Sequence, residues 1–161
     1  MFLIRKGTFE TNSSSTHSFT MCSGKEYDAW EKGELLYWAC NDKFVKANSE
    51  EEDMHYRKCL INQGIERNYE DKTLTYKGVT VPYTWKTWDE DIKAFYTPEN
   101  LNEFTKEQVQ ELIEEGLDDE DKLLSYDEYF EKHDEYYETF DHTYTTPNGE
   151  EVVAFGYYGH D

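Results

Sequence analysis

The sequence predicts a single α+β domain of 161 residues with a mainly antiparallel sheet and about three helices. Segments with strand-like and helix-like patterns follow one another without regular alternation, which favours an antiparallel sheet over a doubly wound parallel one. The 14 Tyr, 9 Phe and 4 Trp residues provide large apolar surfaces for a core, although the net charge is −20. The turn sequence Pro147-Asn148-Gly149 lies between two strand-like runs and predicts a terminal β-hairpin.

The first 23 residues are expected to be mostly extended. Residues 1–6 and 18–23 have strand-like composition and predict two strands. Between them, Asn12 to Ser18 is an unbroken run of small hydrogen-bonding residues, whose side chains compete with helix and sheet hydrogen bonds. Phe9 and Phe19 flank this run. We therefore expect an ordered loop or a bulged strand edge whose two ends are held by buried phenylalanines.

The middle of the chain is expected to contain both helix and hairpin. Residues 26–47 consist of short aromatic runs broken by turn residues, which indicates a meander or a hairpin. An S-x-x-E capping box begins at Ser49 and predicts a helix that ends at Gly64. Residues 73–85 alternate around Lys77-Gly78, which predicts a second hairpin.

The cysteines and the N-terminus indicate a reducing compartment. Cys22, Cys40 and Cys59 are odd in number and form no C-x-x-C pair, so we expect buried free thiols. The first residues lack the apolar region and cleavage site of a signal peptide, and the chain has no run of about 18 apolar residues. A cytoplasmic protein that does not enter a membrane is therefore expected.

Nearly all of the net charge lies in the second half of the chain. Residues 1–86 contain 12 Lys and Arg against 13 Asp and Glu, whereas residues 87–161 contain 4 against 23. We expect a near-neutral α/β platform over residues 1–86 and an acidic helical half over residues 87–161, closed by the hairpin. This asymmetry argues against direct binding of nucleic acid, and favours a basic partner, a cation, or solubility alone.

Three segments of the acidic half carry helix-start signals. Thr97 followed by Pro98 is a typical N-cap and first helical residue. Residues 105–116 have the T-x-x-Q form of a capping box and end in glycine, and residues 125–140 begin with S-x-x-E. In the third segment, Tyr129, His133, Tyr136 and Tyr137 are expected on a common helical face with other aromatic residues.

The segment from Glu111 to Asp141 holds 14 carboxylates against two lysines. On a helix, carboxylates at i and i+4 lie about 6 Å apart along the axis, close to the spacing of phosphates along a nucleic-acid strand. We therefore expect two rows of carboxylates that mimic phosphates, with Tyr129, Tyr136 and Tyr137 as aromatic anchors; a merely solvated face or a cation site is the alternative. The rows are Glu111, Glu114, Glu115, Asp118 and Asp119, then Asp127, Glu128, Glu131, Asp134, Glu135 and Glu138.

An alternative interpretation is a small enzyme that handles phosphates or nucleotides. In it, the run from Asn12 to Ser18 binds a phosphate, and His17 acts as general acid or base beside Ser15 or Ser18. The chain has no P-loop, no G-x-G-x-x-G and no G-x-S-x-G motif, and His133 with its acidic neighbours lacks the spacing of known metal motifs. No cofactor and no metal are expected, and no catalytic residue is assigned under the main hypothesis.

Two parts of the chain resemble a group of small phage and prophage proteins. The likeness lies in the N-terminal run F-E-T-N-S-S-S-T-H-S, in W-E-K-G-E-L-L-Y from Trp30 to Tyr37, and in the last 16 residues. It covers about the first 45 residues and the terminal hairpin. The resemblance implies an origin in a mobile element, where small acidic proteins often inhibit host defence, as anti-CRISPR and anti-restriction proteins do.

The main hypothesis is therefore a phage-derived inhibitor that binds a protein partner in the cytoplasm of the host cell. Its acidic face is expected to occupy a basic groove that normally binds nucleic acid, such as that of an RNA-guided or restriction nuclease. The protein would act as a nucleic-acid mimic and would not itself bind nucleic acid or a membrane.

Overall fold

The computed structural model describes residues 15–62, 66–68, 70–76, 78–88, 91–96 and 102–160. The chain forms two compact units. The terminal unit combines Met1–Ala47 with Lys122–Asp161, and the inserted unit is Asn48–Asp121. The charge boundary at residue 86 lies inside the inserted unit, and both units are acidic, with net charges of −8 and −12 respectively.

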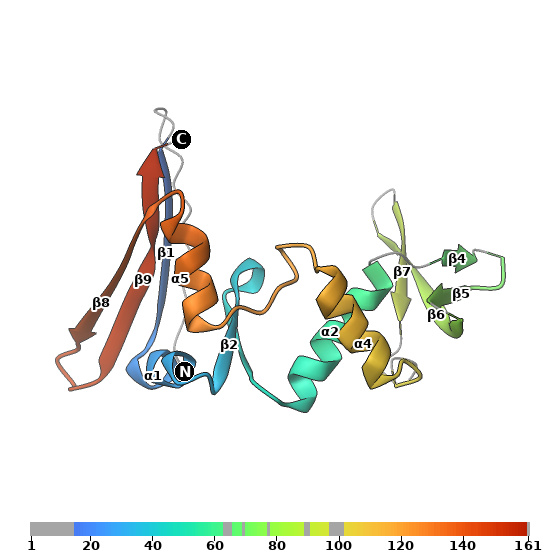
Figure 1. Ribbon diagram of the computed structural model, residues 1–161, viewed down its shortest axis with the longest axis horizontal. Helices are drawn as coiled ribbons and strands as arrows, with labels where there is room; N and C mark the ends of the chain where they lie inside the picture. The colour runs from blue at the N-terminus through green and yellow to red at the C-terminus, as the bar shows by residue number, and fades with distance from the viewer. Residues whose placement is uncertain are drawn as a thin grey trace. The chain divides into compact units, whose positions relative to one another are not determined.

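The terminal unit contains a three-stranded antiparallel sheet in the order β1-β9-β8 and a separate β2-β3 hairpin. Helix α5 lies beside the three-stranded sheet (Figure 1). The elements are β1 (Ser15–Ser23), α1 (Gly24–Glu31), β2 (Leu35–Trp38), the 3-10 turn η1 (Ala39–Asn41), β3 (Lys43–Lys46), α5 (Tyr126–Asp134), β8 (Glu138–Thr145) and β9 (Glu151–His160).

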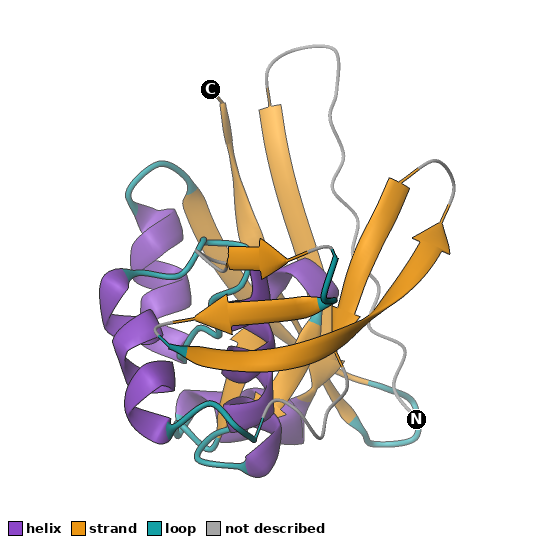
Figure 2. Ribbon diagram, turned by 90° about the vertical axis from the view of Figure 1, so that its right-hand side faces the viewer, coloured by secondary structure: helices purple, strands orange, loops and turns teal. Residues whose placement is uncertain are grey.

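In its described residues, the inserted unit contains helices α2 and α4, which contact each other, and an antiparallel sheet in the order β4-β5-β6-β7. Its elements are α2 (Glu50–Asn62), β4 (Glu66–Asn68), β5 (Thr73–Tyr76), β6 (Val79–Trp88), β7 (Asp91–Tyr96) and α4 (Lys106–Glu115). Helices and antiparallel strands thus occur together, coloured by type in Figure 2, and the predicted α+β class with a terminal β8-β9 hairpin is confirmed. None of the described helices is long and apolar enough to cross a membrane.

The predicted helix starts are confirmed where they rest on capping boxes. Thr105 with Gln108 and Ser125 with Glu128 each form both reciprocal hydrogen bonds, and α4 and α5 begin directly after them. At α2, the Ser49 hydroxyl accepts from the Glu52 N–H at 3.2 Å, as expected. The local sequence is enough to predict where these helices begin, because the two residues of a capping box lie only three positions apart.

Two elements differ from the sequence-based prediction. Helix α1 was expected to be part of a meander, but Ser23 and Glu26 form a complete capping box and a helix follows. Only the remainder of that segment forms the expected hairpin, β2-β3. Helix α5 ends at Asp134, where the Tyr136 N–H donates to the His133 carbonyl in a tightened 3-10-type turn, and the chain then enters β8.

The expected polar loop is wrong for Ser15 to Ser18. These residues form the start of β1, an edge strand, and pair one-to-one with β9 without a bulge. The strand alternates in burial, with Ser18, Thr20 and Cys22 buried and His17 and Phe19 exposed. The expected burial of Phe19 is therefore wrong, because the strand register turns its side chain to the outer face. Other expectations for the N-terminus lie outside the described residues: the strand over residues 1–6, the role of Phe9 and the run from Asn12 to Ser14. The expected helix start at residues 97–98 also lies outside them.

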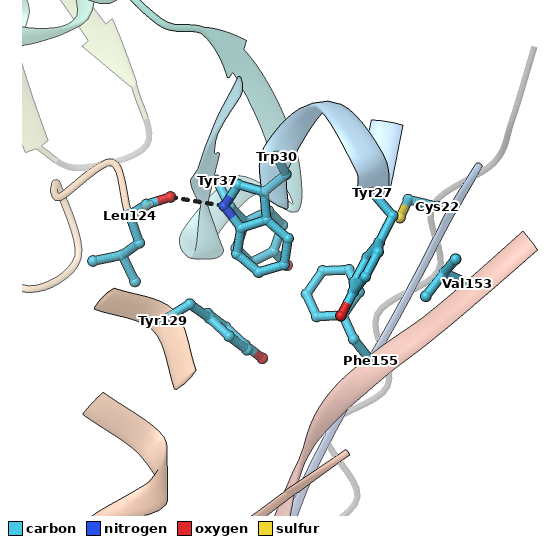
Figure 3. Close-up of a cluster of buried hydrophobic side chains, with 8 residues drawn as sticks. All are labelled: Cys22, Tyr27, Trp30, Tyr37, Leu124, Tyr129, Val153 and Phe155. Atoms are coloured by element: carbon cyan, nitrogen blue, oxygen red, sulfur yellow. Dashed lines mark hydrogen bonds between the residues drawn. The ribbon is translucent and has the colours of Figure 1, made fainter. Parts of the chain in front are cut away.

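Aromatic side chains build the core of the terminal unit (Figure 3). Trp30 of α1 is fully buried, and its indole N–H donates to the Leu124 carbonyl at 3.0 Å. Its ring lies 5.0 Å from that of Phe155 and 5.4 Å from that of Tyr129, centroid to centroid. This indole thus contacts both α5 and the sheet, and Tyr27 of α1 and Tyr129 of α5 also pack directly on Phe155. The full cluster is Cys22, Tyr27, Trp30, Tyr37, Leu124, Tyr129, Val153 and Phe155.

Polar contacts within the inserted unit connect α2 to the segment around α4. The buried Arg57 guanidinium pairs with Asp53 at 2.6 Å and donates to the Phe104 carbonyl. His55 Nε2 lies 2.6 Å from the Asp121 carbonyl oxygen. Burying these polar groups is tolerated because each has a partner.

Candidate partner-binding surface

Every carboxylate in the first predicted row is exposed, but the row is only partly helical. Glu111, Glu114 and Glu115 lie on α4, whereas Asp118 and Asp119 follow the helix end at Gly116. The helical spacing of about 6 Å therefore applies to Glu111 and Glu115 only. The Glu114 carboxylate also accepts from the Gln110 side chain at 3.1 Å.

The second predicted row, in the terminal unit, is also exposed throughout. Asp127, Glu131 and Glu135 follow one another at i+4 along α5 and its C-cap, so they keep the expected spacing. Glu128 serves the capping box of α5, where its carboxylate accepts from the Ser125 N–H at 2.8 Å. Asp134 and Glu138 lie beyond this line, at the helix end and in β8.

The acidic residues at the C-terminal end of α4 oppose the helix dipole. Glu114 and Glu115 occupy its last turn, which contains no basic residue. The partial negative charge at a helix C-terminus disfavours carboxylates there by a few tenths of a kcal/mol or more. The stability of α4 alone therefore does not account for this arrangement.

The three tyrosines expected as anchors differ in exposure. Tyr129 is only 2% exposed and belongs to the core, so it cannot contact a partner. Tyr136 is 71% exposed and Tyr137 is half-buried. The prediction placed all three on one helical face, but only Tyr129 lies within α5.

His17 and Ser18, two of the candidate catalytic residues on β1, do not form a nucleophile and base pair. Ser18 is buried and hydrogen-bonds to Tyr129, whereas the adjacent His17 is exposed on the opposite face of the strand. The imidazole of His17 stacks instead on Tyr158, at a ring distance of 6.3 Å and an angle of 16°. Ser15 begins the strand and pairs with His160.

In the inserted unit, a histidine and a cysteine do lie close together. Cys59 Sγ lies 3.8 Å from His55 Nε2 on the same face of α2. Burial, with a smaller contribution from Asp121, raises the pKa of the Cys59 thiol to about 12. The reactive form of cysteine is the thiolate, so this buried thiol is suited to packing and not to catalysis.

The structure gathers His17 and several predicted binding residues into one cavity, the sheet-end pocket. It has a volume of about 400 Å³ and lies where β1, β8, β9 and the end of α5 meet. Its lining residues are His17, Asp134, Tyr136, Tyr137, Glu138, Tyr158 and Gly159. Sequence reasoning did not assign Tyr158 or Gly159 to a site, although the alternation of the last strand indicates an outward-facing aromatic there.

Three of the lining residues of the sheet-end pocket form a row across three strands. The register pairs Tyr158 of β9 with His17 of β1 on one side and with Glu138 of β8 on the other. The Tyr158 hydroxyl donates to the Glu138 carboxylate, and this hydrogen bond raises the pKa of Tyr158. The carboxylate of Asp134, another lining residue, accepts from the Thr139 hydroxyl through Oδ1 at 2.5 Å. Two carboxylates are thus oriented beside aromatic rings.

His133 of α5 is half-buried and packs against Tyr129 and Tyr157. Its imidazole stacks on Tyr157 at a ring distance of 3.9 Å and an angle of 16°. Burial, aided by Lys132 and opposed by Asp134, lowers the pKa of His133 from 6.5 to about 4. The folded state therefore favours the neutral imidazole.

The depressed pKa of His133 predicts a loss of stability in mild acid. The contribution of neutral His133 to the unfolding free energy is fully present above pH 6.5. It declines as the pH falls toward 4, because the unfolded state binds the proton more readily than the folded state does. We expect the gap in unfolding free energy between the wild-type protein and His133→Gln to change with pH across this window, by about 1–2 kcal/mol. Urea melts of both proteins at pH 7.5, 6 and 4.5 measure it, and a constant gap would contradict the assignment.

Comparison with known proteins adds no family assignment. No family model matches the chain, and neither a curated protein nor a solved structure is significantly similar to it. Within the described part of the chain, no group of three or more His, Cys, Asp or Glu residues is arranged to hold a metal ion.

Proposed function

We propose that this protein is an acidic binding protein that occupies a basic, nucleic-acid-binding groove of another protein. The observation that carries the proposal is that every residue of both carboxylate rows is exposed, on α4 with its following turn and on α5 with its flanking residues. Glu114 and Glu115 remain at the C-terminal end of α4 although they weaken that helix. A role in binding explains why such residues would be retained.

Charge complementarity gives the mechanism of binding in this proposal. Carboxylates accept charge-assisted hydrogen bonds from the Lys and Arg side chains that otherwise hold phosphates. The i and i+4 carboxylates Asp127, Glu131 and Glu135 offer acceptors at about the spacing of successive phosphates. The net charge of −20 adds long-range attraction, which accelerates association with a basic partner.

The proposed partner is a nuclease of host defence that binds nucleic acid, either RNA-guided or of the restriction type. Such enzymes hold nucleic acid through its backbone in a positively charged channel, which an acidic protein can occupy. The resemblance of the N-terminal run and terminal hairpin to phage proteins supports this choice and a place of action in the host cytoplasm. The enzyme alternative gains no support from Ser18, because His17 and Ser18 lie on opposite faces of β1.

The experiment begins with capture of the partner from a bacterial lysate at about 50 mM salt and its purification. Association with the wild-type protein is then measured by surface plasmon resonance from about 50 to 500 mM salt. Exposed charges are screened beyond roughly 8 Å at physiological ionic strength, so the association rate is expected to fall steeply with salt. Binding that is unchanged over this range would contradict the proposal.

Two triple variants test the rows separately, and a third serves as control. Glu111, Glu114 and Glu115 are changed to Gln in one variant, and Asp127→Asn, Glu131→Gln and Glu135→Gln are combined in another. The matched control changes the exposed Glu31, Glu34 and Glu150 to Gln. At least one row variant is expected to slow association about tenfold, while the control stays within twofold of the wild type. Equal effects of all three would mean that net charge, and not the rows, determines binding.

A further inference from the structure

We infer that the sheet-end pocket binds an arginine side chain of the protein partner. The inference rests on the proposed function, since the arginine is taken to belong to the partner's basic groove. It goes further by naming one pocket and one kind of side chain. The pocket volume of about 400 Å³ lies near the lower end of the usual range for ligand sites, which suits one side chain better than a folded segment.

The aromatic rings of the pocket offer flat faces to a flat cation. Tyr136 is 71% exposed and Tyr158 is 40% exposed, so both rings remain accessible. Tyr158 is supported from one side by the stacked His17 imidazole. A guanidinium group stacks on aromatic faces and gains a cation–π attraction of about 0.5–2 kcal/mol.

The carboxylates of the pocket are oriented, and each retains an oxygen for a ligand. Glu138 accepts from the Tyr158 hydroxyl, and Asp134 Oδ1 accepts from Thr139. Among the described residues, no hydrogen bond to Glu138 Oε1 or Asp134 Oδ2 is present. A guanidinium carries five N–H donors in a planar fork and can reach carboxylates while it lies against a ring.

Other ligands fit this pocket less well. Anions would be repelled by Asp134 and Glu138. A lysine ammonium is a strongly hydrated point charge that lacks a planar face for the tyrosines. The combination of open rings and carboxylates therefore favours arginine.

The test uses blocked tripeptides as probes. Acetyl-Gly-Arg-Gly-amide, its lysine counterpart and its citrulline counterpart, which is uncharged but similar in shape, are titrated into the full-length protein. The ring signals of Tyr136 and Tyr158 are followed by NMR with labelled tyrosine and assigned by Tyr→Phe substitution. We expect saturable shifts of both signals with the arginine peptide, at least threefold weaker binding of lysine, and no binding of citrulline.

Two variants give the structural control. Glu138→Gln keeps an oxygen that accepts from Tyr158 but removes the charge, and is expected to weaken arginine binding at least fivefold. Glu31→Gln removes an exposed charge from α1 outside the pocket and outside both carboxylate rows, and is expected to change binding less than twofold. Equal binding of citrulline, a preference for lysine, or unchanged binding in Glu138→Gln would overturn the inference. Non-saturating shifts spread over many tyrosines would overturn it as well.

Failure here is distinguishable from failure of the proposed function. If the arginine peptide does not bind while association with the captured partner still depends on salt and on the carboxylate rows, only the pocket assignment is wrong. The opposite result is that the arginine peptide binds as expected, while association with the captured partner changes neither with salt nor with the carboxylate-row substitutions. In that case the pocket assignment stands for arginine peptides and the groove-binding proposal fails.

Discussion

Replacing Trp30 by alanine is expected to lower the unfolding free energy of the terminal unit by about 3–5 kcal/mol. The indole is fully buried, and it contacts rings from α5, β2 and β9, so no single neighbour can fill the space it leaves. The substitution also removes the hydrogen bond to the Leu124 carbonyl. That carbonyl keeps its second donor, the Tyr37 N–H at 2.8 Å, so the lost packing dominates the effect.

Urea unfolding followed by far-ultraviolet circular dichroism measures the effect. Trp30→Phe, which retains a ring in the core, is the intermediate case and is expected to lose clearly less stability than the alanine variant. Tyr136→Ala is the surface control, because Tyr136 is 71% exposed, and is expected to shift the unfolding free energy by less than about 0.5 kcal/mol. Similar losses for Trp30→Ala and Tyr136→Ala would contradict the described core.

The second large effect is expected for Gly156→Ala. A Cβ atom on Gly156 would lie 2.0 Å from the Ser18 carbonyl oxygen and 3.1 Å from Phe140 Cζ. The oxygen belongs to the backbone of the neighbouring strand β1, so the two strands must separate to make room. We expect a loss of about 3 kcal/mol, at the upper end of the cost of overpacking.

Gly149→Ala provides the matched control for this substitution. Gly149 lies in the β8-β9 turn with φ of +82° and has open space where a Cβ would be placed. Its substitution costs only the strain of the left-handed backbone, about 1 kcal/mol. Thermal or urea melts that show Gly149→Ala to be as destabilising as Gly156→Ala would mean that the close approach between β1 and β9 is wrong.

The parts of the fold that could be predicted are those encoded within a few residues. A few neighbouring residues are enough to recognise the capping boxes at Thr105 and Ser125 and the Asn148-Gly149 turn. The same kind of signal was present at Ser23 and Glu26, but the aromatic content of the segment after it favoured a strand. Tertiary packing of Tyr27 and Trp30 against the sheet makes the helix the better arrangement.

The end of α5 could not be predicted because it depends on pairing over a distance. Residues 135–140 continue a helical pattern, yet Glu138 and its successors bind β9, which adds sheet hydrogen bonds that a longer helix would lose. Pairing over a distance also decides the candidate site. Strand β9 pairs with both β1 and β8 and so brings His17 to Tyr158 and Glu138, residues more than 100 positions away in the sequence. Tyr129 is buried by packing against Trp30, Tyr37 and Phe155. Exposure of the carboxylates, by contrast, follows from charge alone.

Displacement of nucleic acid from the captured partner tests the central claim, that the acidic rows occupy a nucleic-acid groove. A fluorescein-labelled oligonucleotide is bound to the purified partner, and its anisotropy is followed as the protein is added. The account predicts that anisotropy falls to the free value near one equivalent of wild-type protein, and that the two row variants combined require at least a tenfold excess. Anisotropy that stays at the bound value while the protein remains associated with the partner would contradict it.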